Sequence, residues 1–400
     1  MRGSVTSKCM RGHKKADKRC SSRCLRWYYL LDAPAGHEGK RRRQWSEGFA
    51  TKREAEQALT EELARRDQGI ILSGEKITVR QFTQRWLDHL AMLGRDERTL
   101  ERYQELLELH ALPTIGGLQV RALQPHQLSA LYTRLLTQGR RDGKPGGLKP
   151  RTVGHVHRAL HRMLKQAVRW RLIAVNPASD LELPSVIDEP MVTLTYQQAR
   201  TLLEAARPRR WLYVLILLGV ATGARLGELL ALQWADVDLD KGTVRIGRSR
   251  RIVNRRMQVK GPKTEAGYRT VVVGATTIAE LKRLRAEQVR HRLALSRRYY
   301  SAEALVICKP DGRPYRPDSA STMFRVFVDR LGLPKQVHLH TLRHSAASFL
   351  AAARVPASDI AVQLGHADGG ALALKVYVHP LAEGLARAGA HLDDVIGGQR

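Results

Sequence analysis

The sequence is poor in acidic residues and has no long hydrophobic run. Its 38 Asp and Glu stand against 68 Lys and Arg, which gives a formal net charge of +30. The longest strongly apolar run, Trp211 to Val220, is about half of the roughly 20 residues that a membrane-crossing helix needs, so we expect a buried helix there. We find no secretory signal and expect a cytoplasmic protein. The shortage of acids favours a polyanionic partner, nucleic acid above all.

Cysteine is also scarce, and three of the four cysteines lie near the N-terminus around one histidine. The candidate set for a metal is therefore Cys9, His13, Cys20 and Cys24. Three thiols and an imidazole could form a zinc site, but the wide gap between the first two cysteines departs from the usual paired spacing. We expect reduced, unligated cysteines and no metal, and keep zinc as the less favoured alternative.

The chain, with 400 residues, is long enough for two or three domains. Two half-buried strands, around residues 27–32 and 43–50, precede a helix that begins after Thr51 and has Glu54 at its third position, as in a capping box. Apolar residues at helical spacing then continue from residue 77 to 178, interrupted by Gly and Pro. We expect a β-rich N-terminal module at 1–72 and an all-α domain at 77–178.

A mixed α and β domain is expected at 190–400, after a linker at 176–190. Helical patterns at 196–206 and 211–221 are followed by β-type runs at 242–247, 250–254, 257–261 and 268–274, and then by further helices. The predicted fold is therefore multidomain and mainly α, with small β-sheets.

Lys and Arg are spread over the whole length, which suits a protein that tracks a phosphate backbone. In the first module they alternate with aromatic residues, so its strands could lie in a DNA groove as β-ribbon readers do, although charge runs are more often solvated faces. A Gly- and Pro-rich loop before residue 152 carries further cations. The candidate DNA contacts from these stretches are Lys40, Arg41, Arg42, Arg43, Lys149 and Arg151.

Two segments of the third domain carry candidate phosphate ligands. In ATGARLGELL, Arg225 and Glu228 are three residues apart and share a helix face; such a pair is usually a surface ion pair of small energetic value. In HLHTLRHSAAS, His340 and Arg343 lie one turn apart at the start of an Ala-rich helix, whose backbone N–H groups also favour an anion. Arginine and histidine donors at a helix terminus suit a phosphate diester whose oxygens gain charge in the transition state.

A third segment contributes a histidine and the last tyrosine of the chain. His366 follows a helix that we expect to end at Gly365, and Tyr377 lies eleven residues later. In isolation this tyrosine would be a packing residue.

The motifs TGARLGE, HLHTLRH and LGH with a terminal tyrosine, in this order and spacing, resemble the tyrosine recombinase (phage integrase) family. The Gly-rich stretch between His366 and Tyr377 is about one residue longer than we expect for that family.

The resemblance implies a complete catalytic set and its roles. The implied catalytic residues are Arg225, Lys263, His340, Arg343, His366 and Tyr377, with Glu228 in a supporting, orienting role. Tyr377 would attack the phosphorus to form a 3′-phosphotyrosine link, and Lys263, with Lys260 as fallback, would protonate the 5′-hydroxyl leaving group. Because the link conserves the energy of the diester and the arginines neutralise the added charge, we expect no nucleotide or metal cofactor.

The resemblance also extends upstream and implies partners. Residues 1–70 are similar to the arm-type DNA-binding module of integrases, and residues 77–178 to their core-binding domain. We therefore expect double-stranded attachment-site DNA as substrate, a homotetramer on DNA, and no membrane. A recombination directionality factor and a host DNA-bending protein are further candidate partners.

Other functions stay open at this point. A type IB topoisomerase would use the same kind of site but needs little sequence preference, and the extra basic module argues against it. A DNA-binding regulator with an inactive recombinase fold would share the basic composition. A Xer-type chromosome-resolving recombinase would lack the basic N-terminal segment of about seventy residues. We favour the integration or excision of a phage or other mobile element.

Overall fold

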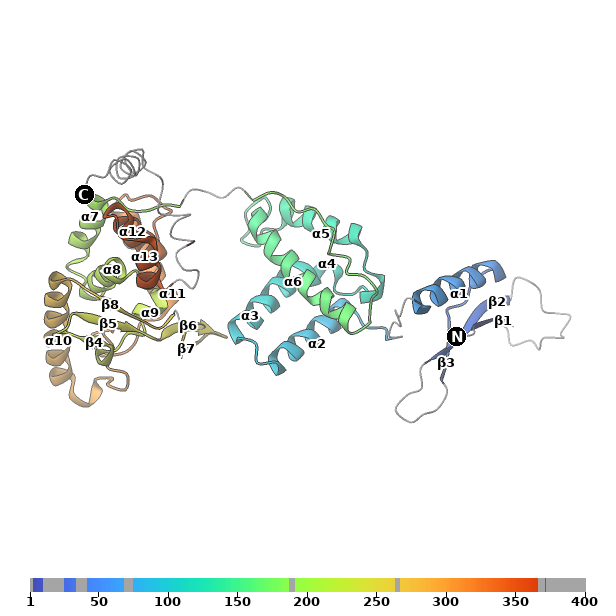
Figure 1. The fold of residues 1–400 in the computed structure, drawn as a ribbon, viewed down its shortest axis with the longest axis horizontal. Helices are drawn as coiled ribbons and strands as arrows, with labels where there is room; N and C mark the ends of the chain where they lie inside the picture. The colour runs from blue at the N-terminus through green and yellow to red at the C-terminus, as the bar shows by residue number, and fades with distance from the viewer. Residues whose placement is uncertain are drawn as a thin grey trace, which may run out of the picture. The chain divides into compact units, whose positions relative to one another are not determined.

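The computed structural model describes residues 3–9, 25–33, 42–67, 75–186, 191–262, 267–365 and residue 371. The chain divides into two compact units, residues 1–187 and 188–400 (Figure 1). Both contain helices and the sheets are small, so the prediction of a multidomain, mainly α chain is confirmed. None of the helices in the described part of the chain is long and apolar enough to span a bilayer.

The N-terminal module is a three-stranded antiparallel sheet with one helix. Its elements are β1 (Gly3–Cys9), β2 (Leu25–Ala33), β3 (Arg42–Trp45) and α1 (Lys52–Asp67). Strand β2 lies in the centre. The predicted capping box is present, because Thr51 Oγ1 accepts from the N–H of Glu54 at 3.2 Å and the Glu54 carboxylate accepts from the N–H of Thr51 at 3.3 Å. The sequence analysis missed β1.

One face of this sheet is apolar and the other is basic and aromatic. Leu31 and Ala55 are fully buried where α1 covers the sheet. Side chains alternate along a strand, so Arg26 and Tyr28 of β2 face away from that core. Lys8, the cross-strand partner of Arg26, places its Nζ 3.5 Å from the centroid of the Trp45 ring. The uncovered face therefore combines cations with aromatic rings.

The second part of the first unit is helical throughout. Its helices are α2 (Val79–Met92), α3 (Glu97–Leu106), α4 (Leu112–Ile115), α5 (Pro125–Gln138) and α6 (Pro150–Arg169). They enclose one core that runs from Ile77 to Ala178, in which Phe82, Trp86 and Leu160 are almost fully buried.

One detail of this region goes beyond the sequence-based prediction of helices, and one corrects the predicted linker. The stretch 98–115 is not one regular helix, because a π-helical turn at Leu107–Ala111 separates α3 from α4. Pro113 has no N–H to give to the carbonyl of Leu109, and Arg141 Nη1 donates to that carbonyl instead, at 2.9 Å. The linker also begins later than residue 176, because Asn176 and Ala178 are buried in the helical core.

The second unit begins with helices and a short sheet. Its first elements are α7 (Tyr196–Ala206), α8 (Arg210–Thr222), α9 (Leu226–Leu229), β4 (Val237–Asp238), β5 (Thr243–Ile246), β6 (Ser249–Val253), β7 (Arg256–Lys260) and β8 (Arg269–Val272). Strands β4, β5 and β8 form one antiparallel sheet, and β6 and β7 form a separate hairpin. The four predicted β-type runs are all strands.

Four further helices complete the described part of this unit. They are α10 (Ala275–Leu295), α11 (Pro317–Arg330), α12 (Leu339–Ala352) and α13 (Ala357–Leu364). Helix α8 is buried along its length, as its apolar run predicts, and packs against α7, α10 and α12. In Figure 1, α10 lies at one side of the unit, and α9 with the β6–β7 hairpin lies at the other.

Candidate active site

The site begins at a tight turn that follows the most buried helix of the unit. Helix α8 ends at Gly223, whose φ of +62° is the left-handed conformation that glycine adopts without strain. The hydroxyl of the buried Thr222 donates to the carbonyl of Leu218 at 2.6 Å and accepts from the N–H of Ala224 at 3.2 Å. This turn brings the chain out of the core at Arg225.

The spacing of Arg225 and Glu228 predicted that both lie within a helix. In the structure Arg225 instead precedes the helix, as the N-terminal cap of the single turn α9. The Glu228 carboxylate accepts from the backbone N–H of Arg225 at 2.9 Å and from its Nη1 at 3.0 Å. The Glu228 side chain is 9% exposed and the Arg225 side chain 47% exposed. The pair is therefore not a surface ion pair; a buried carboxylate holds one edge of a guanidinium that reaches solvent.

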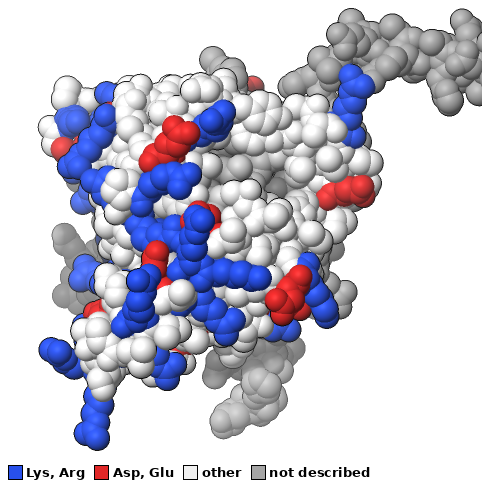
Figure 2. All heavy atoms as spheres, turned by 90° about the vertical axis from the view of Figure 1, so that its left-hand side faces the viewer, with Lys and Arg blue, Asp and Glu red and all other residues white. Residues whose placement is uncertain are grey.

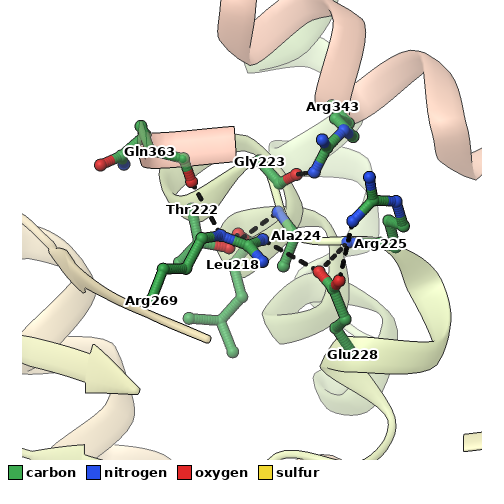
Figure 3. A network of polar contacts seen from close by, with 9 residues as sticks. All are labelled: Leu218, Thr222, Gly223, Ala224, Arg225, Glu228, Arg269, Arg343 and Gln363. Carbon is green, nitrogen blue, oxygen red and sulfur yellow. Dashed lines mark hydrogen bonds and ion pairs between the residues drawn. The ribbon is translucent and has the colours of Figure 1, made fainter. Parts of the chain in front are cut away.

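A second arginine, which the sequence analysis missed, binds the same carboxylate. Arg269 of β8 donates from Nη2 to Glu228 Oε2 at 2.9 Å and from Nε to the backbone carbonyl of Gln363 at 2.9 Å. Its side chain is 3% exposed. Arg269 thereby joins α9, β8 and the end of α13, as Figure 3 shows.

The two arginines keep Glu228 ionised. Burial alone would raise the pKa of this carboxyl, but the hydrogen bond and positive charge of Arg269, together with the N–H and charge of Arg225, outweigh it and hold the pKa below its ordinary value. Glu228 is thus a fixed anion that orients two cations, which agrees with the orienting role expected for it and not with a role in proton transfer.

Arg343 lies on α12, behind the turn that presents Arg225. The residue is 2% exposed, and its Nη1 donates to the carbonyl of Gly223 at 2.9 Å. Helix α12 is fixed against the start of the unit, because Ser345 Oγ donates to the carbonyl of Thr341 at 2.8 Å and accepts from the N–H of Leu194 at 2.8 Å. The guanidinium of Arg343 and the main chain before Arg225 therefore form one rigid arrangement (Figure 3).

His340 lies one helical turn before Arg343, close to both cations of the site. Partial burial, followed by the positive charges of Arg343, His338 and Arg225, lowers its pKa to about 4. Its ring packs edge to face on the ring of His344, with centroids 4.4 Å apart. The imidazole is therefore neutral near pH 7, and its unprotonated ring nitrogen can accept a hydrogen bond or a proton.

The β6–β7 hairpin lies directly against α9. A methyl group at Gly227 would stand 2.5 Å from Ser249 Oγ and 2.6 Å from the backbone oxygen of Arg250, so only glycine permits this close approach. Ser249 pairs with Lys260 across the hairpin. Lys260, the fallback candidate for the acid, is therefore on a hairpin that packs beside Arg225, whereas β8 belongs to the other sheet.

Several predicted residues lie outside the described part of the chain. They are Lys263, His366, Tyr377, Lys40, Arg41, His13, Cys20 and Cys24. The backbone of Arg42 and Arg43 belongs to β3. Lys149 caps α6 and Arg151 follows in its first turn, both exposed. Among the described residues, no cluster of three or more His, Cys, Asp or Glu is arranged to hold a metal ion.

The described residues thus bring two arginines and a neutral histidine close together, a set of groups that could bind an anion. Arg225, Arg343 and the neutral His340 offer charged and neutral groups at one place, and Glu228 with Arg269 fixes their geometry from behind. Guanidinium groups bind phosphate oxygens in pairs. Preorganised donors of this kind can stabilise the charge that develops on a phosphate group in a transition state.

Comparisons with known proteins show which family the sequence is similar to. The sequence profile of the phage integrase family matches residues 193–383, and that of an arm DNA-binding domain matches residues 18–64. The chain is 24% identical over 388 residues to a tyrosine recombinase XerC-like protein of Caldanaerobacter subterraneus, which covers 92% of this chain and 96% of that protein. It is 28% identical over 359 residues to an integrase of Streptomyces ambofaciens, which covers 88% and 89% respectively.

Solved structures show the same fold. The Tn1549 transposon integrase in complex with transposon right end DNA has a TM-score of 0.64 and 20% identity, and covers 79% of this chain and 99% of that one. A lambda integrase dimer bound to a COC′ core site has a TM-score of 0.57 and 15% identity, with 88% and 92% covered. The predicted fold class, an arm-type module, a helical domain and a mixed domain, is confirmed.

Proposed function

Because the chain belongs to the phage integrase family of tyrosine recombinases, we propose that it integrates or excises a mobile element at a defined attachment sequence. Enzymes of this family break and rejoin DNA strands. The observation that carries the proposal is the fixed set of Arg225, Arg343 and His340, built on the buried Glu228–Arg269 pair. We assign residues 1–72 to arm-site binding, 77–178 to core-site binding and 190–400 to catalysis.

In the proposed reaction Arg225 and Arg343 bind the non-bridging oxygens of the scissile phosphate. Tyr377 Oη attacks the phosphorus, the bond to the 5′ oxygen breaks, and Lys263 gives that oxygen a proton. A tyrosine has a pKa of about 10, so the phenol must lose its proton as attack begins. The neutral imidazole of His340 is a suitable acceptor, and we assign a second assisting role to His366.

Rejoining reverses these steps with a different 5′-hydroxyl as the attacking group. The phosphotyrosine bond breaks, the new diester forms and Tyr377 recovers its proton. Because the energy of the original diester is kept in the phosphotyrosine, the exchange requires neither a nucleotide nor, with two arginines at the phosphate, a divalent metal.

DNA binding is proposed for two further surfaces. The uncovered face of the N-terminal sheet presents Lys8, Arg26 and the ring of Trp45, a combination that suits a strand pair lying in a groove. Lys149 and Arg151 stand exposed at the start of α6, where the helix N-terminus also favours a phosphate. A lambda integrase of the same fold forms a tetramer on a Holliday junction, and we propose a homotetramer on DNA here, with a directionality factor and a DNA-bending protein as accessory partners.

The test is the covalent intermediate. Wild-type protein and Tyr377→Phe are incubated in EDTA with candidate attachment-site DNA that carries a 5′-bridging phosphorothiolate, which traps the adduct. We expect a 3′-linked adduct with the wild type and none with the variant. Cleavage without sequence preference would support a type IB topoisomerase instead. Absence of any adduct on DNA that the protein binds would support a regulator with an inactive site.

A further inference from the structure

Helix α10 carries a basic surface at the side of the second unit opposite α9 and the β6–β7 hairpin. Figure 2 views that side and shows Lys and Arg gathered there, with fewer Asp and Glu between them. The cations of α10 and of the short turn after it are all exposed. They are Lys282, Arg283, Arg285, Arg290, Arg292, Arg297 and Arg298. We call this surface the α10 face.

Most of these cations are not neutralised by neighbouring carboxylates. Arg283 binds Glu280 at 2.7 Å, and Glu280 and Glu287 also bind Arg210. No acidic side chain in the described part of the chain forms an ion pair with the other six cations of the α10 face. Surfaces with such an excess of one charge attract a polyanion over long range.

The cations follow both edges of the helix. Arg285 and Arg292 are seven residues apart on one edge, and Arg283 and Arg290 are seven apart on the other, so each pair spans about 10 Å. Between the edges lie Val289 and Leu293, which are 52% and 76% exposed. A helix of this width fits the major groove of a duplex, which is about 12 Å wide, with its edge cations toward the phosphates of both strands.

Aromatic rings border the same surface. A hollow of about 230 Å³ lies beside α10, lined among others by Trp234, Tyr299, Tyr300, Arg285 and Arg292. The Arg285 guanidinium lies over the Trp234 ring, 5.7 Å from its centroid. Stacking of this kind restricts the arginine while leaving its N–H groups free to donate to an external acceptor.

We propose that the α10 face binds a second DNA duplex, distinct from the one whose phosphate is held at Arg225 and Arg343. The inference rests on the proposed function only in that the first duplex is the recombination substrate. A rigid duplex held at the catalytic site does not reach the opposite side of the same unit. The second duplex is therefore a flanking segment that has folded back, or a separate molecule.

A crosslinking experiment tests where DNA lies. The full chain carries the photocrosslinker p-benzoylphenylalanine in place of Leu293, at the centre of the α10 face, or in place of Tyr196 on α7, which is 60% exposed. A labelled duplex of arbitrary sequence is added to protein already saturated with unlabelled attachment-site DNA. We expect crosslinks to the labelled duplex from position 293 and not from position 196.

Charge variants test what holds the duplex. Lys282→Gln, Arg290→Gln and Arg297→Gln are combined, because none of the three contacts an acidic side chain in the described residues. Arg200→Gln, Arg330→Gln and Arg354→Gln remove the same charge elsewhere in the unit. Loss of three phosphate contacts makes the slope of log K against log salt less negative by about 2.7. We expect this change, and loss of the crosslink, only in the α10 variant.

The outcomes separate this inference from the proposed function. A Tyr377 adduct without any crosslink from position 293 would overturn the second-duplex inference and leave the recombinase intact. A crosslink from 293 to another protein chain would also overturn it. A crosslink to DNA without the adduct would support the α10 face while contradicting the catalytic assignment.

Discussion

At the scale of single residues, the buried Arg269 is the strongest test of the site geometry. Arg269→Ala leaves the Glu228 carboxylate buried with one cation fewer, and removal of one partner from a buried ion pair costs about 3–5 kcal/mol. We expect a fall of that size in the free energy of unfolding, measured by denaturant titration. Arg245→Ala is the matched control, since that side chain is 67% exposed and also pairs with an aspartate; its effect should stay within about 0.5 kcal/mol.

A conservative change at position 269 tests whether Arg269 positions the catalytic groups in addition to stabilising the fold. Arg269→Lys keeps the charge but cannot reach both Glu228 and the Gln363 carbonyl. We expect slower formation of the covalent adduct, with unchanged affinity for duplex DNA, in single-turnover assays. An adduct rate equal to that of the wild type would show that the bridge to α13 does not position catalytic groups.

Glu228 gives the stability of the second unit a dependence on pH. The pKa of Glu228 is lower in the folded than in the unfolded protein. Its contribution to the free energy of unfolding is therefore fully present above about pH 4.5, and is lost as the pH falls through the lower pKa of the folded protein. Glu228→Gln should flatten this part of the stability curve, measured by unfolding at several pH values. If the free energy of unfolding of the variant fell with decreasing pH as steeply as that of the wild type, Glu228 would not be the group responsible.

The pKa of His340 is also lowered, but for a histidine a lowered pKa favours the neutral form of the side chain. Its folded pKa of about 4 lies below the ordinary value of 6.5, so protons bind the unfolded chain first as the pH falls below 6.5, and stability is lost down to about 4. In the free protein, NMR should find the His340 ring neutral at pH 6. A titration midpoint above 6 would remove the basis for His340 as a proton acceptor.

At the scale of elements, the contact between α9 and the β6–β7 hairpin depends on Gly227. Gly227→Ala would place a methyl group 2.5 Å from Ser249 Oγ and 2.6 Å from the Arg250 backbone oxygen. The hairpin must then move away, and we expect at least a tenfold fall in adduct formation, as about 1.4 kcal/mol of lost positioning would give. Adding Ser249→Ala should not rescue the rate, because the backbone oxygen stays.

At this scale, some elements could be predicted from the sequence and others could not. The boundaries of α7 and α8 and the four strand positions follow from local patterns, because apolar spacing and turn residues act over short distances. The contacts of Arg269 do not, because its partners lie 41 and 94 residues away. The position of Arg225 as the N-cap of α9 could not be predicted either, because residue spacing alone does not distinguish the first residue of a helix from its cap. Strand β1 was missed because Val5 and Cys9 are its only apolar side chains, too few for an alternating pattern.

At the scale of the whole molecule, each unit has a core of its own, one from Ile77 to Ala178 and one from Leu194 to Leu342. Separate cores favour separate unfolding transitions. We expect two transitions in calorimetry, of which Arg269→Ala lowers only the one that belongs to residues 188–400. That unit expressed alone should retain its transition temperature; a single transition shifted as a whole by the variant would contradict two independent cores.

The bond from Arg269 to the carbonyl of residue 363 has a consequence for how the gene can vary. The acceptor is main chain, so nearly any side chain at position 363 presents the same oxygen, while only an arginine at 269 spans both acceptors. In a saturation library selected for recombination, position 363 should therefore accept many different residues and position 269 only arginine, although one hydrogen bond joins the two residues.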